Sequence, residues 1–252
     1  MSDAPLPDDW EEHWERFAES AESNPAQRYR TRLIWSSVRL GDGPARFVDV
    51  GSGQGDICAT IRRRAPGAEI LGLELSDVGC EISRRKVPTG TFLQRDLVAP
   101  AKGVPERFRR WGTHAVCSEV LEHVDRPDLL LKNAREYLAS GCRLVVTVPG
   151  GPMSKFDRHI GHRRHYTRGA LRELLSAADL EVERVSAAGF PFHNLYRLAV
   201  LARGSRLVQD ARGPSPSGAM RVVTAFFNVA FRANLPRTPW GWQIVAVARV
   251  PG

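Results

Sequence analysis

The chain has 252 residues, of which 42% are hydrophobic and 25% charged, a composition typical of one globular α/β domain with additions. No apolar run approaches the roughly 18 residues that a membrane-spanning helix needs. The acidic start, MSDAPLPDDWEEHWERF, is unlike a secretory signal, so we expect a cytoplasmic protein. The net charge of +8 comes mostly from arginine and by itself indicates no nucleic-acid partner.

Strands and helices alternate along the chain after an N-terminal helical stretch. The expected strands are Ala45–Val50, Glu69–Leu75, Thr91–Leu97, Thr113–Ser118, Arg143–Val148, Glu181–Ser186 and Trp242–Val250. The expected helices between them are Asp56–Ala65, Asp77–Lys86, Asp128–Leu138 and Thr167–Ala178. This alternation predicts a parallel sheet that helices cover on both faces.

The chain divides into three expected parts. Residues 1–40 form an N-terminal helical lid, residues 41–190 with 241–252 form the core, and residues 191–240 form a helical insertion. The insertion holds two apolar helices near Asn194–Val208 and Met220–Ala233, joined by a glycine- and proline-rich stretch. It could form a lid or a homodimer contact, or rest on a membrane surface with Arg197, Arg203 and Arg206 toward lipid headgroups. Its apolar candidates for lining a pocket are Leu195, Leu198, Leu201, Phe226, Phe227 and Phe231.

The stretch FVDVGSGQGD places glycines at alternate positions directly after the first strand. Glycine permits positive φ angles and lets a ligand touch the backbone. The dinucleotide pattern G-x-G-x-x-G would need glycine at position 56, where this chain has Asp56. Because a carboxylate at this helix start disfavours a pyrophosphate, a neutral or cationic ligand fits better.

Several motifs resemble class I S-adenosylmethionine-dependent methyltransferases over roughly residues 40–190. Asp49-x-Gly51-x-Gly53-x-Gly55 resembles their cofactor loop, and acids follow in GLELS (Glu74) and QRDL (Asp96). CSEVLEHV resembles the fourth-strand motif of their small-molecule branch. The resemblance implies a Rossmann-like, doubly wound α/β sheet, mostly parallel with an antiparallel last strand. It also implies S-adenosylmethionine as cofactor and S-adenosylhomocysteine as product.

The resemblance assigns cofactor contacts residue by residue. Glu74 would bind the ribose hydroxyls and Asp96 the adenine amine, with Leu75 and Leu97 beside the adenine ring. Tyr29 and Arg30 would meet the methionine carboxylate, although core packing and surface charge explain them almost as well. The complete implied set is Tyr29, Arg30, Asp49, Gly51, Ser52, Gly53, Gly55, Glu74, Leu75, Asp96, Leu97, Ser118 and Glu119.

Methyl transfer to a hydroxyl needs a general base, and histidine is the usual choice. His123 follows the fourth strand, where the methyl group should point, although it could instead only hydrogen-bond locally. His162, in the cluster KFDRHIGHRRHYT, is an alternative base. Arginines of this cluster could grip an anionic acceptor, or the segment could be a solvated basic loop; they are Arg158, Arg163 and Arg164.

Glu119-x-x-Glu122-His123 resembles the metal motif of ubiquinone-pathway O-methyltransferases and small-RNA 2′-O-methyltransferases, in which Mg²⁺ or Mn²⁺ would polarise a hydroxyl. The same letters occur in metal-free relatives, so we expect no required metal. We expect methyl transfer to an oxygen of a small-molecule or lipid-linked acceptor, which could be anionic. The alternatives are metal-assisted RNA 2′-O-methylation and cofactor binding without catalysis.

Overall fold

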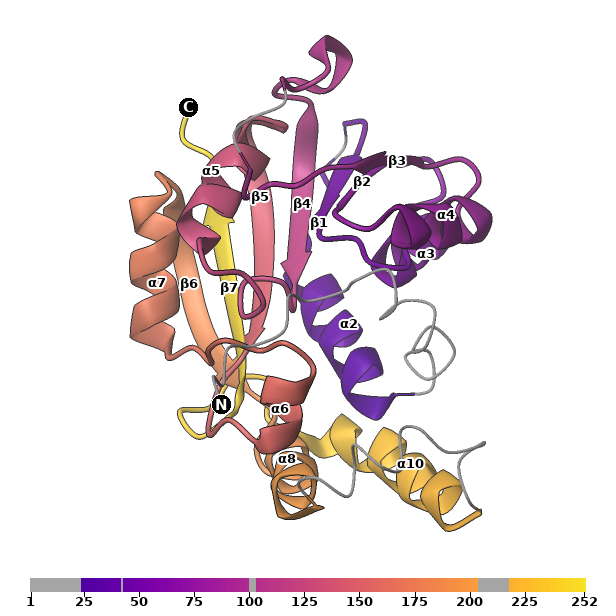
Figure 1. The fold of residues 1–252 in the computed structure, drawn as a ribbon, viewed down its shortest axis with the longest axis vertical. Helices are drawn as coiled ribbons and strands as arrows, with labels where there is room; N and C mark the ends of the chain where they lie inside the picture. Colours follow the sequence, from indigo (N-terminus) through magenta and orange to yellow (C-terminus); the bar gives the residue numbers. More distant parts are fainter. Residues whose placement is uncertain (1–23, 42, 100–102, 204–217) are drawn as a thin grey trace, which may run out of the picture.

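The computed structural model describes residues 24–41, 43–99, 103–203 and 218–252, and Figure 1 shows their arrangement. Seven strands form one sheet: β1 (Arg46–Val50), β2 (Glu69–Glu74), β3 (Thr91–Gln94), β4 (Gly112–Ser118), β5 (Leu138–Pro149), β6 (Glu181–Ala188) and β7 (Gln243–Arg249). The α-helices are α2 (Pro25–Ser37), α3 (Asp56–Arg64), α4 (Asp77–Lys86), α5 (Pro127–Arg135), α6 (Lys155–His159), α7 (Arg168–Ala177), α8 (Phe192–Arg203) and α10 (Gly218–Ala230). Two short 3-10 helices are η1 (Glu106–Phe108) and η2 (Phe231–Ala233).

The strand order across the sheet is β3-β2-β1-β4-β5-β7-β6. Neighbouring strands are parallel except at β7, which runs antiparallel to both β5 and β6. The predicted doubly wound sheet with an antiparallel last strand is therefore confirmed. The strand order reverses between β1 and β4, and ligands of such sheets bind beside this switch point. The glycine turn after β1 lies there, next to the loop that follows β4.

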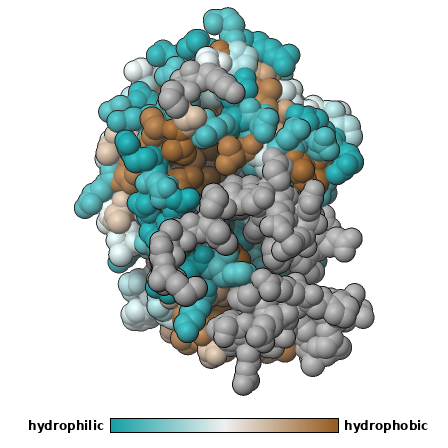
Figure 2. All heavy atoms as spheres, in the orientation of Figure 1, coloured by the Kyte–Doolittle hydropathy of each residue, from teal (hydrophilic) through white to brown (hydrophobic). Residues whose placement is uncertain are grey.

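Alternate residues of the strands pack against helices on opposite faces of the sheet. On one face, Leu131 of α5 and Leu175 of α7 share a buried cluster with Val48 of β1. On the other face, Ile34 of α2 packs in a cluster with Val116 of β4, and α3 and α4 cover the β1–β3 side. Figure 2 shows that hydrophilic side chains cover much of the visible surface, with hydrophobic ones grouped mainly in its upper half.

Several predicted boundaries differ from the structure, and strand pairing explains those at β3 and at the junction of α5 with β5. β3 ends at Gln94 because the strand it pairs with, β2, ends opposite it at Glu74. β5 begins at Leu138, which the sequence predicts as the end of a helix, since Leu138 pairs with Gly112 of β4. The helix α5 accordingly ends at Arg135. Neighbouring strands thus override the local preference of these residues.

The insertion before β7 contributes α8 and α10, which pack near α2. The ring of Phe231 lies 5.6 Å from the rings of Tyr29 and Phe227, and 5.8 Å from that of Tyr196. Residues 204–217, with most of the predicted glycine- and proline-rich joint, and residues 1–23 lie outside the described residues. Within the described ranges, no helix is both long and apolar enough to cross a membrane.

Candidate active site

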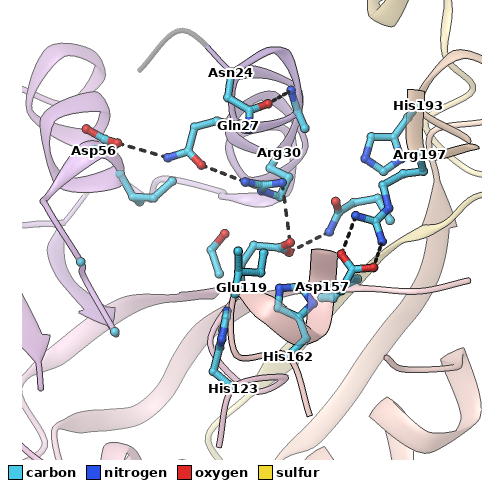
Figure 3. A pocket seen from close by; sticks show the side chains of 18 of the residues that line it. Asn24, Gln27, Arg30, Asp56, Glu119, His123, Asp157, His162, His193 and Arg197 are labelled. Atoms are coloured by element: carbon cyan, nitrogen blue, oxygen red, sulfur yellow. Dashed lines mark hydrogen bonds and ion pairs between the residues drawn. The ribbon is translucent and has the colours of Figure 1, made fainter. Parts of the chain in front are cut away.

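Two adjoining cavities lie beside the switch point of the sheet. The larger has a volume of about 330 Å³ and lies between the glycine turn, α2, α6 and α8. The smaller has a volume of about 110 Å³ and lies beside the ends of β2 and β3. Gly51, Glu119 and His123 line both cavities, so the two spaces meet at these residues. Figure 3 shows side chains of α2, α6, α8 and the loop after β4 converging on the larger cavity.

Most residues assigned to the cofactor by resemblance line these cavities. Those in the larger cavity are Arg30, Asp49, Gly51, Ser52, Gly53, Ser118 and Glu119. Those in the smaller cavity are Gly51, Glu74, Leu75, Asp96, Leu97 and Glu119. Tyr29 lines neither, because α2 turns it into the aromatic cluster around Phe231. Gly55 also lines neither, because it packs against Ser83 of α4. A Cβ added to Gly55 would lie 2.8 Å from Oγ of Ser83.

The glycine turn is held tightly against its neighbours. Gly51 has a φ of +71°, and a Cβ added to it would lie only 2.5 Å from Cγ2 of Val120. Gly53 also has a positive φ, and its backbone nitrogen donates to Oε2 of Glu74 at 2.7 Å. Only glycine adopts such angles at low cost. The turn therefore presents bare backbone to both cavities.

Carboxylates gather around this turn. Asp49, at 2% exposure, accepts a hydrogen bond from Sγ of Cys58 at 3.2 Å. Burial, together with the negative charges of Glu74 and Asp56, raises the pKa of Asp49 to about 7 against the lowering effect of the Cys58 hydrogen bond. Opposite charge nearby would favour the ionised form of Asp49. The turn is consequently suited to a cationic ligand.

The smaller cavity combines apolar walls with acidic groups. Leu75 leaves 46% of its surface exposed, whereas Leu97 is buried. Asp96 lies in the loop two residues after β3 rather than at the end of the strand, and its Oδ1 accepts hydrogen bonds from the backbone nitrogens of Val98 and Ala99. Both acids of the predicted pair, Glu74 and Asp96, line this cavity.

An ion pair joins α2 to the loop after β4. Arg30 lies 3.6 Å from Oε2 of Glu119 and donates to Oε1 of Gln27 at 2.9 Å, as Figure 3 shows. Oε1 of Glu119 accepts hydrogen bonds from Gln243 of β7 and Thr147 of β5. Glu119 has a φ of +57°, an uncommon angle for a residue other than glycine. Its carboxylate is thus fixed between the sheet and α2, and the charge of Arg30 is paired.

Three histidines from two segments come together beside the larger cavity. The ring centroids of His123 and His162 lie 4.6 Å apart in an edge-on arrangement. Nδ1 of His162 lies 3.2 Å from Nε2 of His165, and Nδ1 of His165 lies 3.1 Å from the carbonyl oxygen of Gly151. Burial, followed by the neighbouring His123, lowers the pKa of His162 to about 2. His162 is therefore neutral and able to accept a proton only transiently.

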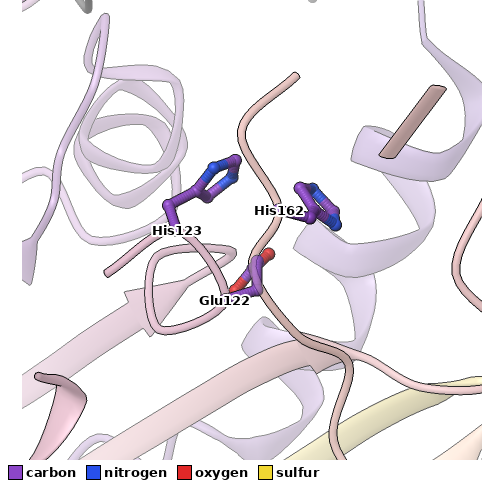
Figure 4. A group of neighbouring side chains, drawn as sticks. All are labelled: Glu122, His123 and His162. Atoms are coloured by element: carbon purple, nitrogen blue, oxygen red, sulfur yellow. The ribbon is translucent and has the colours of Figure 1, made fainter. Parts of the chain in front are cut away.

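Glu122 is fully buried beside the two cavity-lining histidines, and Figure 4 shows it between the rings of His123 and His162. These three residues each offer a ligand atom, all within 4.8 Å of one another. Neither carboxylate oxygen of Glu122 has a hydrogen-bond partner among the described residues. Burial raises the pKa of Glu122 well above its usual range, and the charge of Glu119 adds to this. A neutral carboxylic acid accounts for this burial.

A buried ion pair ties α8 to α6. Both guanidinium nitrogens of Arg197 donate to the carboxylate of Asp157, at 2.9 and 2.8 Å. Asp157 also forms a capping box with Ser154 at the start of α6. Burial alone would raise the pKa of Asp157, but hydrogen bonds and charge from Arg197, with the Ser154 bonds, outweigh it and lower the pKa to about 2. Arg197 therefore faces inward. The placement toward lipid headgroups, which the sequence allows, is not the one that the structure shows.

We expect Arg197→Met to lower the free energy of unfolding by about 3–5 kcal/mol, because it leaves a buried carboxylate unpaired. The depressed pKa of Asp157 stabilises the protein above its ordinary pKa of about 4, and this contribution is lost as the pH falls toward 2. The difference between variant and parent should shrink over that range. Chemical denaturation at several pH values measures it. Arg135→Met, which removes an exposed pair with Asp179, is the control and should change stability by under about 1 kcal/mol.

The insertion lines the larger cavity with a different face from the predicted one. None of the six apolar candidates named above contacts this cavity; Leu195, Leu198 and Phe226 are exposed, and Phe227 and Phe231 are buried in the core. The lining residues of α8 recur at helical spacing and are His193, Tyr196, Arg197 and Val200. The direction of α8 relative to the sheet decides which face it presents.

The basic arginines after β5 do not line the larger cavity. Arg158 is exposed, Arg163 pairs with Asp125, and Arg164 donates to the carbonyl oxygen of Asp125 at 3.2 Å. The residues before His162 also form the short helix α6 rather than a loop. The predicted arginine grip on an anionic acceptor is thus not formed by these side chains.

Sequence reasoning missed several lining residues, namely Gln27, Asp157, His193, Arg197 and Gln243. Ser154 followed three residues later by Asp157 is a recognisable helix-start pattern and could have located Asp157. No local signal marks the other four, since they enter the site from α2, α8 and β7 through packing.

Relatives of known name share the core of the chain. It is 33% identical over 119 residues to the demethylmenaquinone methyltransferase of Thermus thermophilus, covering 47% of this chain and 53% of that protein. The chain spans about half the length of the curated relatives that it matches first.

Solved structures with the same fold have low identity. The geranyl diphosphate C-methyltransferase of Streptomyces coelicolor, solved with Mg²⁺, geranyl diphosphate and S-adenosylhomocysteine, has a TM-score of 0.56 at 16% identity, covering 89% of this chain and 78% of that chain. The cyclase SpnF has a TM-score of 0.63 at 16% identity and covers 99% of both chains. Since a cyclase shares this fold, the fold alone does not establish methyl transfer. A family model described as a methyltransferase domain matches residues 26–185, more than half of the chain, which therefore belongs to the class I S-adenosylmethionine-dependent methyltransferases.

Proposed function

We propose that this protein transfers a methyl group from S-adenosylmethionine to an oxygen of a small, uncharged acceptor. The observation that carries the proposal is the junction of the two cavities. At this junction the backbone of Gly51, the carboxylate of Glu119 and the ring of His123 line both cavities. A ligand that spans both cavities would pass this point, and an acceptor in the larger one would meet it there.

The adenosine of the cofactor is proposed to occupy the smaller cavity. Glu74 would accept hydrogen bonds from the ribose hydroxyls and Asp96 from the adenine amine, since carboxylates offer paired acceptors. Leu75 and Leu97 would contact the adenine ring. The methionine part would cross Gly51 into the larger cavity, where the surrounding acids favour its sulfonium and ammonium charges. When bound, the cofactor supplies an electrophilic methyl group, and the chain's residues orient it against the acceptor.

The acceptor is proposed to be apolar with one reactive hydroxyl. Apolar and aromatic side chains form much of the lining of the larger cavity, and they include Phe156, Ile160, Tyr196, Val200 and Trp242. Both arginines that line it are already paired, Arg30 with Glu119 and Arg197 with Asp157. An anionic acceptor, in addition to the cofactor's own carboxylate, would therefore have to break one of these ion pairs, and breaking that of the buried Asp157 is costly. A neutral acceptor avoids this cost, and a lipid-linked one remains compatible with it.

Cofactor turnover with a panel of acceptors tests the proposal. The panel contains apolar phenols and alcohols, their carboxylate or phosphate analogues, quinols that accept methyl on carbon, and a short RNA. We expect S-adenosylhomocysteine to form with the uncharged hydroxyl compounds, and mass spectrometry to place the new methyl on oxygen. Methylated carbon would correct the acceptor atom, and tight cofactor binding without turnover of any acceptor would favour a binding protein.

A divalent metal is not expected to be required. Glu122, His123 and His162 could together hold a cation, but this set has one carboxylate and two imidazoles, whereas Mg²⁺ prefers oxygen ligands. Glu119, the first carboxylate of the motif, is held by Arg30, Gln243 and Thr147. Turnover after treatment with EDTA should stay within about twofold of that of untreated protein. Loss of activity that Mg²⁺ or Mn²⁺ restores would instead assign a metal role to this cluster.

A further inference from the structure

A chain of hydrogen bonds runs from the end of the sheet to His162, and it starts at a rigid point. The backbone nitrogen of Gly150 donates to the carbonyl oxygen of Trp242 at 2.7 Å. Gly151 follows with a φ of +70°, and a Cβ added to it would lie 2.6 Å from the Trp242 indole. Its carbonyl oxygen is therefore held in place between β5 and β7.

That carbonyl determines which nitrogen of His165 carries a proton. A carbonyl oxygen only accepts hydrogen bonds, so Nδ1 of His165, 3.1 Å away, must be the donor. Burial lowers the pKa of His165, so the ring is neutral and its Nε2 keeps a lone pair. Oδ2 of Asp157 lies 3.8 Å from Nε2, beyond hydrogen-bond range, and it already accepts bonds from Arg197 and Ser154. Nε2 of His165 is thus left as an acceptor.

The same reasoning determines which nitrogen of His162 carries a proton. Nδ1 of His162 lies 3.2 Å from the Nε2 acceptor of His165, so it is Nδ1 of His162 that donates. A neutral imidazole carries one proton, which leaves the Nε2 lone pair of His162 available. Nε2 lies on the ring edge away from His165. His162 lines the larger cavity, whereas His165 does not.

We infer that His165 fixes His162 in the tautomer with a free Nε2 lone pair, which makes His162 the base for the acceptor proton and His165 a positioning residue. This rests on the proposed function. In the transfer, the acceptor O–H proton moves to Nε2 of His162 while the oxygen–methyl bond forms. The sulfur–methyl bond breaks with its electron pair staying on sulfur, and the protonated His162 then releases its proton to water.

Two variants of His165 separate positioning from simple packing. Gln in place of His165 offers an amide N–H for the Gly151 carbonyl and an amide oxygen for Nδ1 of His162. Leu in its place offers neither. We expect His165→Leu to lower kcat by about 10- to 100-fold and to leave the KM for cofactor little changed. Removing a hydrogen-bond partner that orients a functional histidine ring has an effect of this size. His165→Gln should restore kcat to within about threefold of the parent. His159→Leu, at an exposed position of α6, is the matched control.

Nitrogen-15 NMR of the histidine rings supplies a readout that needs no turnover. In the parent protein and in His165→Gln, we expect Nε2 of His162 to show the shift of an unprotonated nitrogen and Nδ1 that of a protonated one. In His165→Leu, Nε2 should gain proton character. A protonated Nε2 in the parent, or unchanged kcat and shifts in His165→Leu, overturns the inference. Failure of Gln to restore kcat also overturns it. Absence of turnover with every acceptor would overturn the proposed function instead. The nitrogen-15 shifts would still show which nitrogen of His162 is protonated, and so test the inference separately.

Discussion

Gly51→Ala should weaken cofactor binding by about 100-fold. The added Cβ would lie 2.5 Å from Cγ2 of Val120, and the φ of +71° is strained for any residue other than glycine. The left-handed angle costs roughly 1–2 kcal/mol and the overpacking roughly 1–3 kcal/mol. The turn must move to relieve the strained φ angle and the clash with Val120. A combined cost of about 3 kcal/mol corresponds to about a 100-fold increase in Kd. Isothermal titration calorimetry with S-adenosylmethionine measures the effect.

A matched glycine substitution isolates the turn. Gly67 has no neighbouring atom within 4 Å of an added Cβ and no positive φ, so Gly67→Ala should bind the cofactor as the parent does. Thermal unfolding of both variants checks that each remains folded. Parent-like affinity in a folded Gly51→Ala protein would remove the glycine turn from the proposed cofactor site.

His162→Ala should reduce kcat by about 100- to 10,000-fold, the range that a general base contributes. The Kd for cofactor should change by less than about threefold, because the adenosine is proposed to occupy the smaller cavity, which His162 does not line. Burial holds the pKa of His162 at about 2, so the ring is unprotonated across the physiological pH range and holds the acceptor proton only transiently. Single-turnover methyl transfer and calorimetry separate the two quantities.

Comparison with His123 decides which ring is the base. His123→Ala removes a packing partner of His162, with ring centroids 4.6 Å apart, and should reduce kcat less than His162→Ala does. The exposed His159 offers a control, since His159→Ala should leave kcat unchanged. A larger loss in His123→Ala than in His162→Ala would assign the base to His123.

Much of the core could be predicted because its signals are local. Alternating apolar strands and capped helices depend on residues close in sequence, as at Thr167, whose Oγ1 caps α7 by accepting from Ala170. The glycine turn after β1 and the acid at the end of β2 are equally local. Parallel strands bring their carboxyl ends to one edge of the sheet, so these signals also predicted that Gly51, Glu74 and Asp96 line one site.

Errors arose where a partner strand or helix sets the outcome. Leu138 belongs to a strand because Gly112 pairs with it, although its apolar character suits the end of a helix equally well. Likewise, Tyr29 is amphipathic and suits either a ligand or a core, and packing against Phe231 places it in the core. Nothing in the residues themselves distinguishes these alternatives.

The sequence by itself determined the sheet with its switch point, the glycine turn and the acids beside it, since each depends on short-range pattern and strand direction. Only the tertiary structure decided the pairing of Arg197 with Asp157, the pairing of Arg30 with Glu119 and the alignment of His165 with His162. The two ion pairs join segments 40 and 89 residues apart, and hydrogen-bond direction needs distances of about 3 Å. Local preference carries no information at that range, so the two ion pairs follow from how the helices pack on the sheet.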